Sequence, residues 1–146
     1  MEPPAPAAAP DRRPPPQVIS MHGCLLIFAA SGPLFAPPEL RELTAPPSLE
    51  TMQGLVGGPI QIVPAFTTTS DNAACIAFCN EEGKVNDLPV NRRATLLWDA
   101  AVRRVSPDGS GIRRGNEFAD FLVGTVVVMT GDAAFLAAWS AEDDDE

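Results

Sequence analysis

The apolar positions of the chain fall into short runs that predict strands. Residues 24–29 form a continuous apolar run ended by Ser31-Gly32-Pro33, which is typical of a buried strand bounded by a turn. Residues 60–66, 73–79 and 121–130 are mostly apolar, and the last range is rich in β-branched residues. These ranges predict a mixed or antiparallel sheet of about four strands.

Helical spacing is clearest after Asn91, a favourable N-cap residue. Apolar residues recur at i, i+3, i+4, i+7, i+8 and i+11 and form one stripe: Ala94, Leu97, Trp98, Ala101, Val102 and Val105. We expect Arg92, Asp99 and Arg103 on the opposite face, with Asp99 paired to Arg103 four residues later. The sequence therefore predicts one long amphipathic helix packed on the sheet.

Two shorter helices are also predicted. Residues 49–56 follow Ser48, another favourable N-cap residue, and end at Gly57-Gly58, which is typical of a helix C-terminus. Asp132 is suitably placed to cap a helix over residues 133–139.

Proline, glycine and polar residues mark the connections. Residues 37–47 contain four prolines, so we expect this linker to be irregular. Residues 80–84 resemble a turn in which Gly83 takes a positive φ. Residues 106–115 contain Pro107, Gly109, Gly111 and Gly115, so we expect a flexible loop there.

Composition sets the domain limits. Residues 1–20 are rich in proline and alanine, which favours a disordered tail without helix or sheet. Residues 21–140 are long enough for a single α+β domain with its own core. Residues 141–146 form an acidic tail, which carries much of the formal net charge of -9.

The order of several short motifs resembles a known family. The motifs are Leu55-Val56-Gly57-Gly58, Ile60-Gln61-Ile62-Val63-Pro64, Asn80-Glu81-Glu82-Gly83-Lys84, Leu88-Pro89-x-Asn91 with Ala94-Thr95, and Leu122-Val123-Gly124-Thr125-Val126-Val127-Val128. Over residues 21–131 the chain resembles the Domain of Unknown Function 3846 family of bacteria, phages and other mobile or viral genomes. It departs at Pro59, where the family usually has an aromatic residue. The resemblance implies a small α+β domain with an accessory role and assigns no catalytic residues.

The arginine residues are the candidate site for binding an anionic partner. Between residues 91 and 114 the basic residues form three pairs: Arg92 and Arg93, Arg103 and Arg104, and Arg113 and Arg114. Such a patch on an acidic protein is able to bind a nucleic acid or another anionic partner. The competing interpretation, which we favour, is a solvated helix face with some heads paired to carboxylates. The absence of Tyr for base stacking argues against nucleic acid in particular.

One histidine and three cysteines raise the possibility of a metal or cysteine enzyme. His22, Cys24, Cys75 and Cys79 include enough ligands for a tetrahedral zinc ion. In a strand, however, Cys75 and Cys79 stand about 13 Å apart, too far for one ion. Neither H-x-C nor C-x-x-x-C is a usual zinc spacing. We therefore expect buried structural thiols, with no metal and no cofactor.

Other catalytic patterns are weak. His22 is the only histidine, and the chain has no G-x-S-x-G sequence. The neighbouring Glu81 and Glu82 diverge in a turn, and residues 54–58 lack the Lys-Ser/Thr of a phosphate-binding loop. The sequence favours a non-catalytic domain over an enzyme.

These patterns predict a small interaction domain, and the family resemblance implies an accessory role, with a viral or mobile-element origin as one alternative. We expect an unidentified protein partner, with nucleic acid as a less favoured one. No apolar run approaches the roughly 20 residues that a membrane-spanning helix needs. The expected location is the cytoplasm, or the host cytoplasm if the chain is viral.

Overall fold

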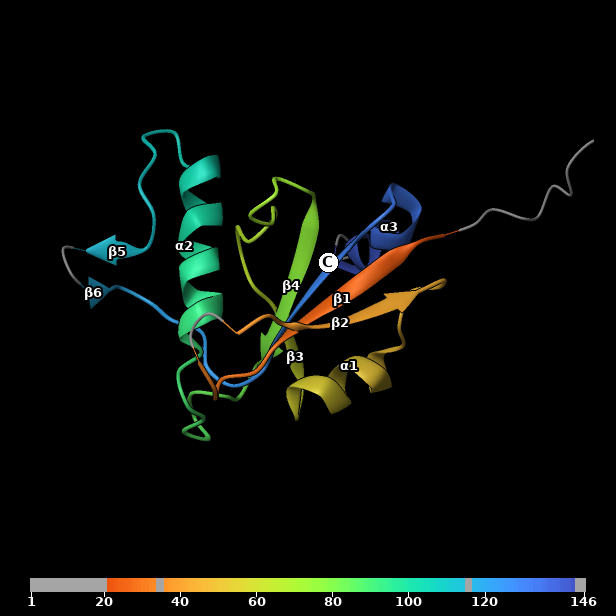
Figure 1. Cartoon of the computed structure of the whole chain (residues 1–146), viewed down its shortest axis with the longest axis horizontal. Coiled ribbons are helices and arrows are strands. Elements are labelled where there is room, and N and C mark those ends of the chain that lie inside the picture. Colours follow the sequence, from red (N-terminus) through yellow and green to blue (C-terminus); the bar gives the residue numbers. More distant parts are fainter. Residues whose placement is uncertain (1–20, 34–35, 115–116, 144–146) are drawn as a thin grey trace, which may run out of the picture.

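The computed structural model describes residues 21–33, 36–114 and 117–143 (Figure 1). Its strands are β1 (Gly23–Phe28), β2 (Glu39–Leu43), β3 (Ile60–Ile62), β4 (Cys75–Asn80), β5 (Arg113–Arg114), β6 (Glu117–Phe118) and β7 (Val126–Gly131). Its helices are α1 (Leu49–Val56), α2 (Arg92–Val105) and α3 (Ala133–Asp143). The predicted tail at residues 1–20 lies outside the described residues. Part of the predicted acidic tail, residues 141–143, forms the end of α3.

Five antiparallel strands form the main sheet, in the order β2-β1-β7-β4-β3. β7 is the central strand and pairs with β1 on one side and β4 on the other. β5 and β6 form a separate two-stranded sheet. The α+β class predicted from the sequence is confirmed, with five strands in the main sheet instead of four.

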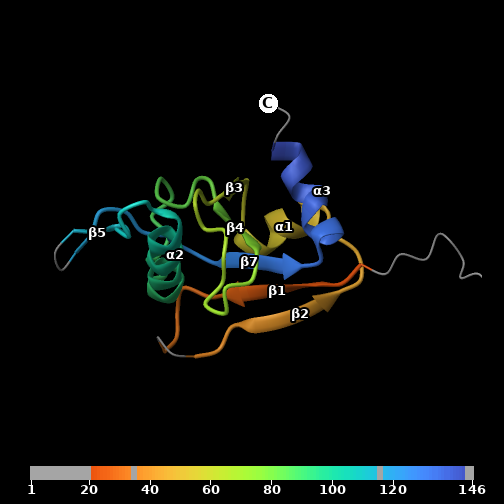
Figure 2. The same cartoon turned by 90° about the horizontal axis from the view of Figure 1, so that it is seen from above.

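Helices cover both faces of this sheet. Val126 and Val128 of β7 pack in one apolar cluster with α2, whereas Val127 and Met129 pack in a second cluster with α1 and α3. Figures 1 and 2 show α2 apart from α1 and α3. These four side chains of β7 are all buried. Burial on both faces explains why this strand is apolar at successive positions instead of alternating.

The strand β2 was not predicted, since the proline-rich linker was expected to be irregular. Glu39–Leu43 pairs with β1 over five residues, with Leu40 opposite Leu26. Three of its five residues are charged, and most of the strand is exposed. Its own sequence therefore gives little strand signal, and the pairing depends on the apolar strand beside it.

The N-caps were predicted correctly at both α1 and α2. The Ser48 side chain accepts a hydrogen bond from the Thr51 N–H (3.1 Å), and the Asn91 side chain accepts one from the Ala94 N–H (3.0 Å). Gly57 ends α1 with φ 85°. No helix in the described part of the chain is long and apolar enough to cross a membrane.

α3 packs on the sheet where two glycines lie opposite each other. Gly23 of β1 pairs with Gly131 of β7, and the fully buried ring of Phe135 lies over them. A Cβ on Gly23 would lie 2.3 Å from this ring, and a Cβ on Gly131 would lie 2.6 Å from the His22 carbonyl oxygen. The Asp132 carboxylate accepts the His22 N–H (2.8 Å), so the start of α3 is also tied to β1.

Candidate functional site

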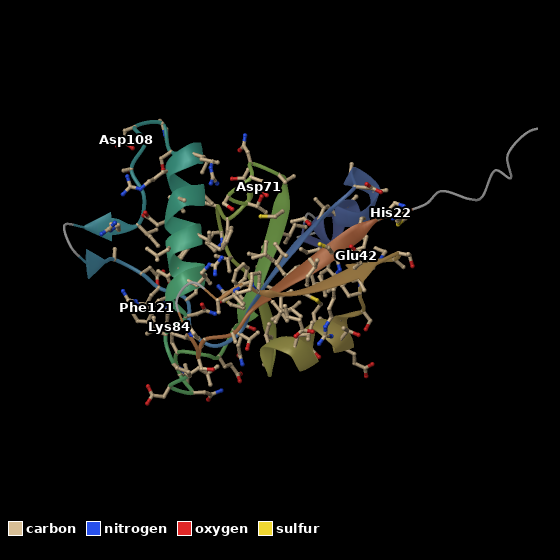
Figure 3. All side chains as sticks on the ribbon, viewed as in Figure 1. His22, Glu42, Asp71, Lys84, Asp108 and Phe121 are labelled. Carbon is tan, nitrogen blue, oxygen red and sulfur yellow. The ribbon has the colours of Figure 1, made fainter. Side chains whose placement is uncertain are left out.

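A small pocket lies where the turn after β4 meets α2 and the segment that precedes β7; we call it the turn pocket. Its volume is about 170 Å³. Its buried lining residues are Val63, Cys79, Asn80, Trp98, Leu122 and Val123. Its opening carries the charged or aromatic side chains of Glu81, Lys84, Asp120 and Phe121. Figure 3 shows Lys84 and Phe121 next to each other below α2.

Lys84 links the two sides of the pocket opening. Its ammonium group forms an ion pair with Asp120 and lies 4.8 Å from the centre of the Phe121 ring. Burial alone would raise the pKa of Asp120, but the hydrogen bonds from Lys84 and from the Phe121 N–H, with the Lys84 charge, outweigh it and lower this pKa. Asp120 is therefore ionised at neutral pH.

Apart from Asn80, the buried lining of the turn pocket is apolar. The Trp98 indole N–H donates to the Pro64 carbonyl oxygen (2.9 Å), so this donor is already used. Burial raises the pKa of Cys79, with a lowering effect from the Lys84 charge and a raising effect from Asp120. The Cys79 thiol is therefore protonated at neutral pH and is a poor nucleophile.

Asn80 and Gly83 hold the turn that forms one side of the pocket. The Asn80 side chain accepts the Glu82 N–H (2.8 Å) and donates to the Val56 carbonyl oxygen at the end of α1 (3.3 Å). The positive φ predicted for Gly83 is wrong; the residue with a positive φ is Asp87, four positions later, at 62°. Gly83 is required for close packing, because a Cβ there would lie 2.7 Å from Val123.

Asn91 fixes the other side of the pocket. This residue is fully buried, and its amide nitrogen donates to the carbonyl oxygens of Phe28 and Gly124, both at 2.8 Å. Its backbone N–H donates to the Leu122 carbonyl oxygen (2.7 Å). One side chain therefore joins the start of α2 to β1 and to the segment that lines the pocket.

The arginines named as binding candidates have mostly intramolecular partners. Arg93 donates to the Ala36 carbonyl oxygen and lies 5.5 Å from the Phe28 ring centre. Arg103 pairs with Asp99 at 3.0 Å, as predicted, and Arg104 donates to the Thr68 hydroxyl at 2.6 Å. The structure therefore directs these three guanidinium groups to different parts of the chain.

The remaining candidates are Arg92, Arg113 and Arg114. Arg92 is exposed at the start of α2, and Arg113 is exposed in β5, where its charge acts on Asp99. The side chain of Arg114 lies outside the described part of the structure. Anion binding by the arginine pairs stays a prediction.

Asp99 differs from its predicted position on an exposed helix face. It is only 6% exposed, because the loop after α2 folds over it. The Ile112 N–H donates to Asp99 (2.8 Å), and a Cβ on Gly111 would lie 2.1 Å from the same carboxylate oxygen. Burial tends to raise the pKa of Asp99, but hydrogen bonds from Arg103 and Ile112, with the charges of Arg103 and Arg113, lower it overall.

This lowered pKa predicts a pH effect on stability. The ionised carboxylate stabilises the fold above the unfolded-state pKa of about 3.9, and this contribution is lost as the pH falls through the lower folded-state value. We expect Asp99→Asn to reduce the free energy of unfolding by about 1–2 kcal/mol at neutral pH. The difference in free energy of unfolding between wild type and Asp99→Asn should become smaller in acid, where the Asp99 carboxylate of the wild type is protonated. Urea unfolding of both proteins at several pH values measures it, and a difference independent of pH would contradict the assignment.

His22 and Cys24 line one open surface pocket at the start of β1, but the buried thiols of Cys75 and Cys79 do not line it. His22 is exposed at the start of β1, and Figure 3 shows it on the opposite side of the molecule from Lys84 and Phe121. Burial raises the pKa of Cys75 to about 12, despite the Arg104 charge, and its thiol donates to the Phe66 carbonyl oxygen (3.6 Å). Among the described residues, no group of three His, Cys, Asp or Glu side chains is placed to hold a metal ion.

Thiol labelling tests these environments. In native protein at pH 8 we expect iodoacetamide to modify the partly exposed Cys24 first, while the buried Cys75 and Cys79 react only after unfolding in urea. Mass spectrometry of the labelled peptides distinguishes the three sites. Rapid native labelling of Cys79 would contradict a protonated, inert thiol and would favour the cysteine-enzyme alternative.

Sequence reasoning missed the turn pocket as a site. It identified the turn at residues 80–84 but not its contact with Asp120 and Phe121. Lys84 and Asp120 are 36 residues apart, and no periodic pattern relates them. The one local signal was a lysine at the end of a tight turn, which is common on protein surfaces.

Comparison with known proteins identifies the family. The chain matches the family model described as Domain of unknown function (DUF3846) over residues 33–136. Comparison with curated proteins and with solved structures gives no significant match. The matched range contains all five sequence motifs that suggested the resemblance, together with α2 and the turn pocket. The chain therefore belongs to the Domain of unknown function (DUF3846) family.

Proposed function

We propose that this chain is a non-catalytic interaction module whose turn pocket receives one side chain of a protein partner. The observation that carries the proposal is the form of the pocket, with a largely apolar base and a charged opening. Its volume of about 170 Å³ is below the 300–1,000 Å³ range of pockets for drug-sized molecules and cofactors. A buried apolar contact surrounded by polar groups is typical of the centre of a protein interface.

The ionisable groups of the pocket support binding over bond-making. General acid-base catalysis works best with a group whose pKa lies near the working pH. The pKa of Cys79 is raised and that of Asp120 is lowered, so both lie further from neutrality than their ordinary values. Lys84 is engaged with Asp120 and Phe121. In line with the family resemblance, we propose an accessory role in the cytoplasm, or in the host cytoplasm if the chain is viral.

Affinity purification with matched variants tests the proposal. We expect Phe121→Ala and Lys84→Glu to weaken binding of a recovered protein partner at least tenfold, because both change the opening of the pocket. Leu49→Ala is the control, since Leu49 is 51% exposed on α1 outside the pocket. Titration of the purified partner against the four proteins, wild type included, gives the affinities.

Two outcomes would contradict the proposal. One is a partner that binds both pocket variants as tightly as the wild type. The other is recovery of a nucleic acid whose salt-sensitive binding is lost in Arg92→Glu but kept in Phe121→Ala, which would favour the arginine face of α2 instead.

A further inference from the structure

The two edges of the main sheet differ in how far they are open to another strand. β3 is three residues long and lies between Pro59 and Pro64, which have no backbone N–H to donate. β2 is five residues long, contains no proline, and lies along the outer side of the sheet in Figure 2. One row of its backbone N–H and C=O groups has no partner strand in the described part of the chain.

Pairing with β1 places the β2 side chains on two faces. Leu40 lies opposite Leu26, on the α2 face, and is 55% exposed. Glu39 and Arg41 share the other face and form an ion pair at 2.8 Å. The strand therefore carries an exposed apolar residue between two opposite charges.

We propose that β2 pairs with β2 of a second copy of this chain, antiparallel and centred on Leu40. In this register Leu40 lies opposite Leu40 of the copy, and Glu39 lies opposite Arg41 twice by symmetry. Each cross-strand charge pair is then attractive. A register centred on Arg41 would place two guanidinium groups opposite each other, which is unfavourable. The charge pattern thus selects both the occupant and the register.

The small size of the β2–β2 contact determines the protein concentration at which the dimer is expected to form. The register centred on Leu40 pairs residues 39–41 of the two copies and sets Glu42 opposite Pro38, so the contact buries less than the roughly 1,200 Å² of a standard interface. The net charge of -9 on each copy also opposes association. The dimer is therefore expected at micromolar to millimolar concentration and at physiological ionic strength, where repulsion between distant charges is screened.

Sedimentation velocity of the full chain over this concentration range measures the association. Arg41→Glu would place two carboxylates opposite each other and is expected to raise the dimer dissociation constant at least tenfold. The double variant Glu39→Arg with Arg41→Glu restores opposite charges and is expected to return the constant to the wild-type range. Arg92→Glu is the matched control, because it reverses an exposed arginine on α2 and leaves β2 unchanged.

Cross-linking tests the register. Side chains directly opposite each other in an antiparallel pair have Cβ atoms about 4.5–5.5 Å apart, close to disulfide geometry. In a Cys24→Ser background, Leu40→Cys is expected to give a disulfide-linked dimer on mild oxidation. Glu50→Cys, at an exposed position on α1, is expected to stay monomeric under the same conditions.

Thermal unfolding shows whether each variant is folded. A wild-type chain that stays monomeric up to millimolar concentration overturns the proposal. A dimer that is equally strong in Arg41→Glu overturns it as well, as does a dimer that yields no disulfide from Leu40→Cys. If Arg41→Glu fails to fold, the charge-reversed double variant and the cross-link still decide the question.

Discussion

Asn91→Ala is expected to lower the free energy of unfolding by about 3–5 kcal/mol. The substitution removes the N-cap of α2 and leaves the carbonyl oxygens of Phe28 and Gly124 without their amide donor in a buried site. A loss of this size is a large part of the 5–15 kcal/mol that stabilises a typical domain. Urea unfolding followed by circular dichroism measures it.

Ser48→Ala is the control for this prediction. It also removes a side-chain N-cap, but at an exposed position on α1, so we expect a loss of only about 1 kcal/mol. Equal losses in the two variants would show that capping, and not the two buried carbonyl groups, accounts for the contribution of Asn91.

Phe135→Ala is expected to cost about 3–5 kcal/mol, because it empties the contact between α3 and the sheet. In the wild-type background, Gly23→Ala is expected to cost about 1–3 kcal/mol, since its Cβ would overlap the Phe135 ring. In the Phe135→Ala background the same glycine substitution should cost almost nothing. The two effects should therefore be non-additive in a double-mutant cycle measured by urea unfolding.

Gly131→Ala provides the contrast within the same pair of strands. Its φ is 152°, and the atoms nearest to a Cβ there belong to the backbone of His22 and Gly23. These backbone atoms stay in place when the Phe135 ring is removed. Gly131→Ala should therefore lower the free energy of unfolding in both the wild-type and the Phe135→Ala backgrounds. Full additivity for Gly23→Ala with Phe135→Ala would contradict the proposed packing.

Features that depend on neighbouring residues were predictable from the sequence. Ser48 and Asn91 cap helices because their side chains reach N–H groups three residues later, and this signal is local. The apolar stripe of α2 was also correct over its first three turns, with Ala94 and Trp98 buried. Val105 at its end is 52% exposed and does not pack in the apolar cluster that contains Ala94 and Trp98.

Features that depend on distant parts of the chain were not predictable. β2 is a strand because β1 lies beside it, and Asp99 is buried because a later loop covers it. The predicted strand over residues 121–130 starts later, at Val126, since the preceding residues pair with the Asn91 region and line the turn pocket. The site itself joins residues brought together by this folding, so no single sequence window contained it.

The strand order has a consequence for synthesis of the protein. β7 is the last strand of the sheet to leave the ribosome, yet it occupies the middle position between β1 and β4. Until it emerges, the two earlier strands each lack the neighbour that joins them, and their apolar side chains stay open to misassembly. A nascent chain interrupted before residue 126 can pair β1 with β2 and β3 with β4, but it cannot join these pairs into the five-stranded sheet, and we expect it to be bound by chaperones or degraded.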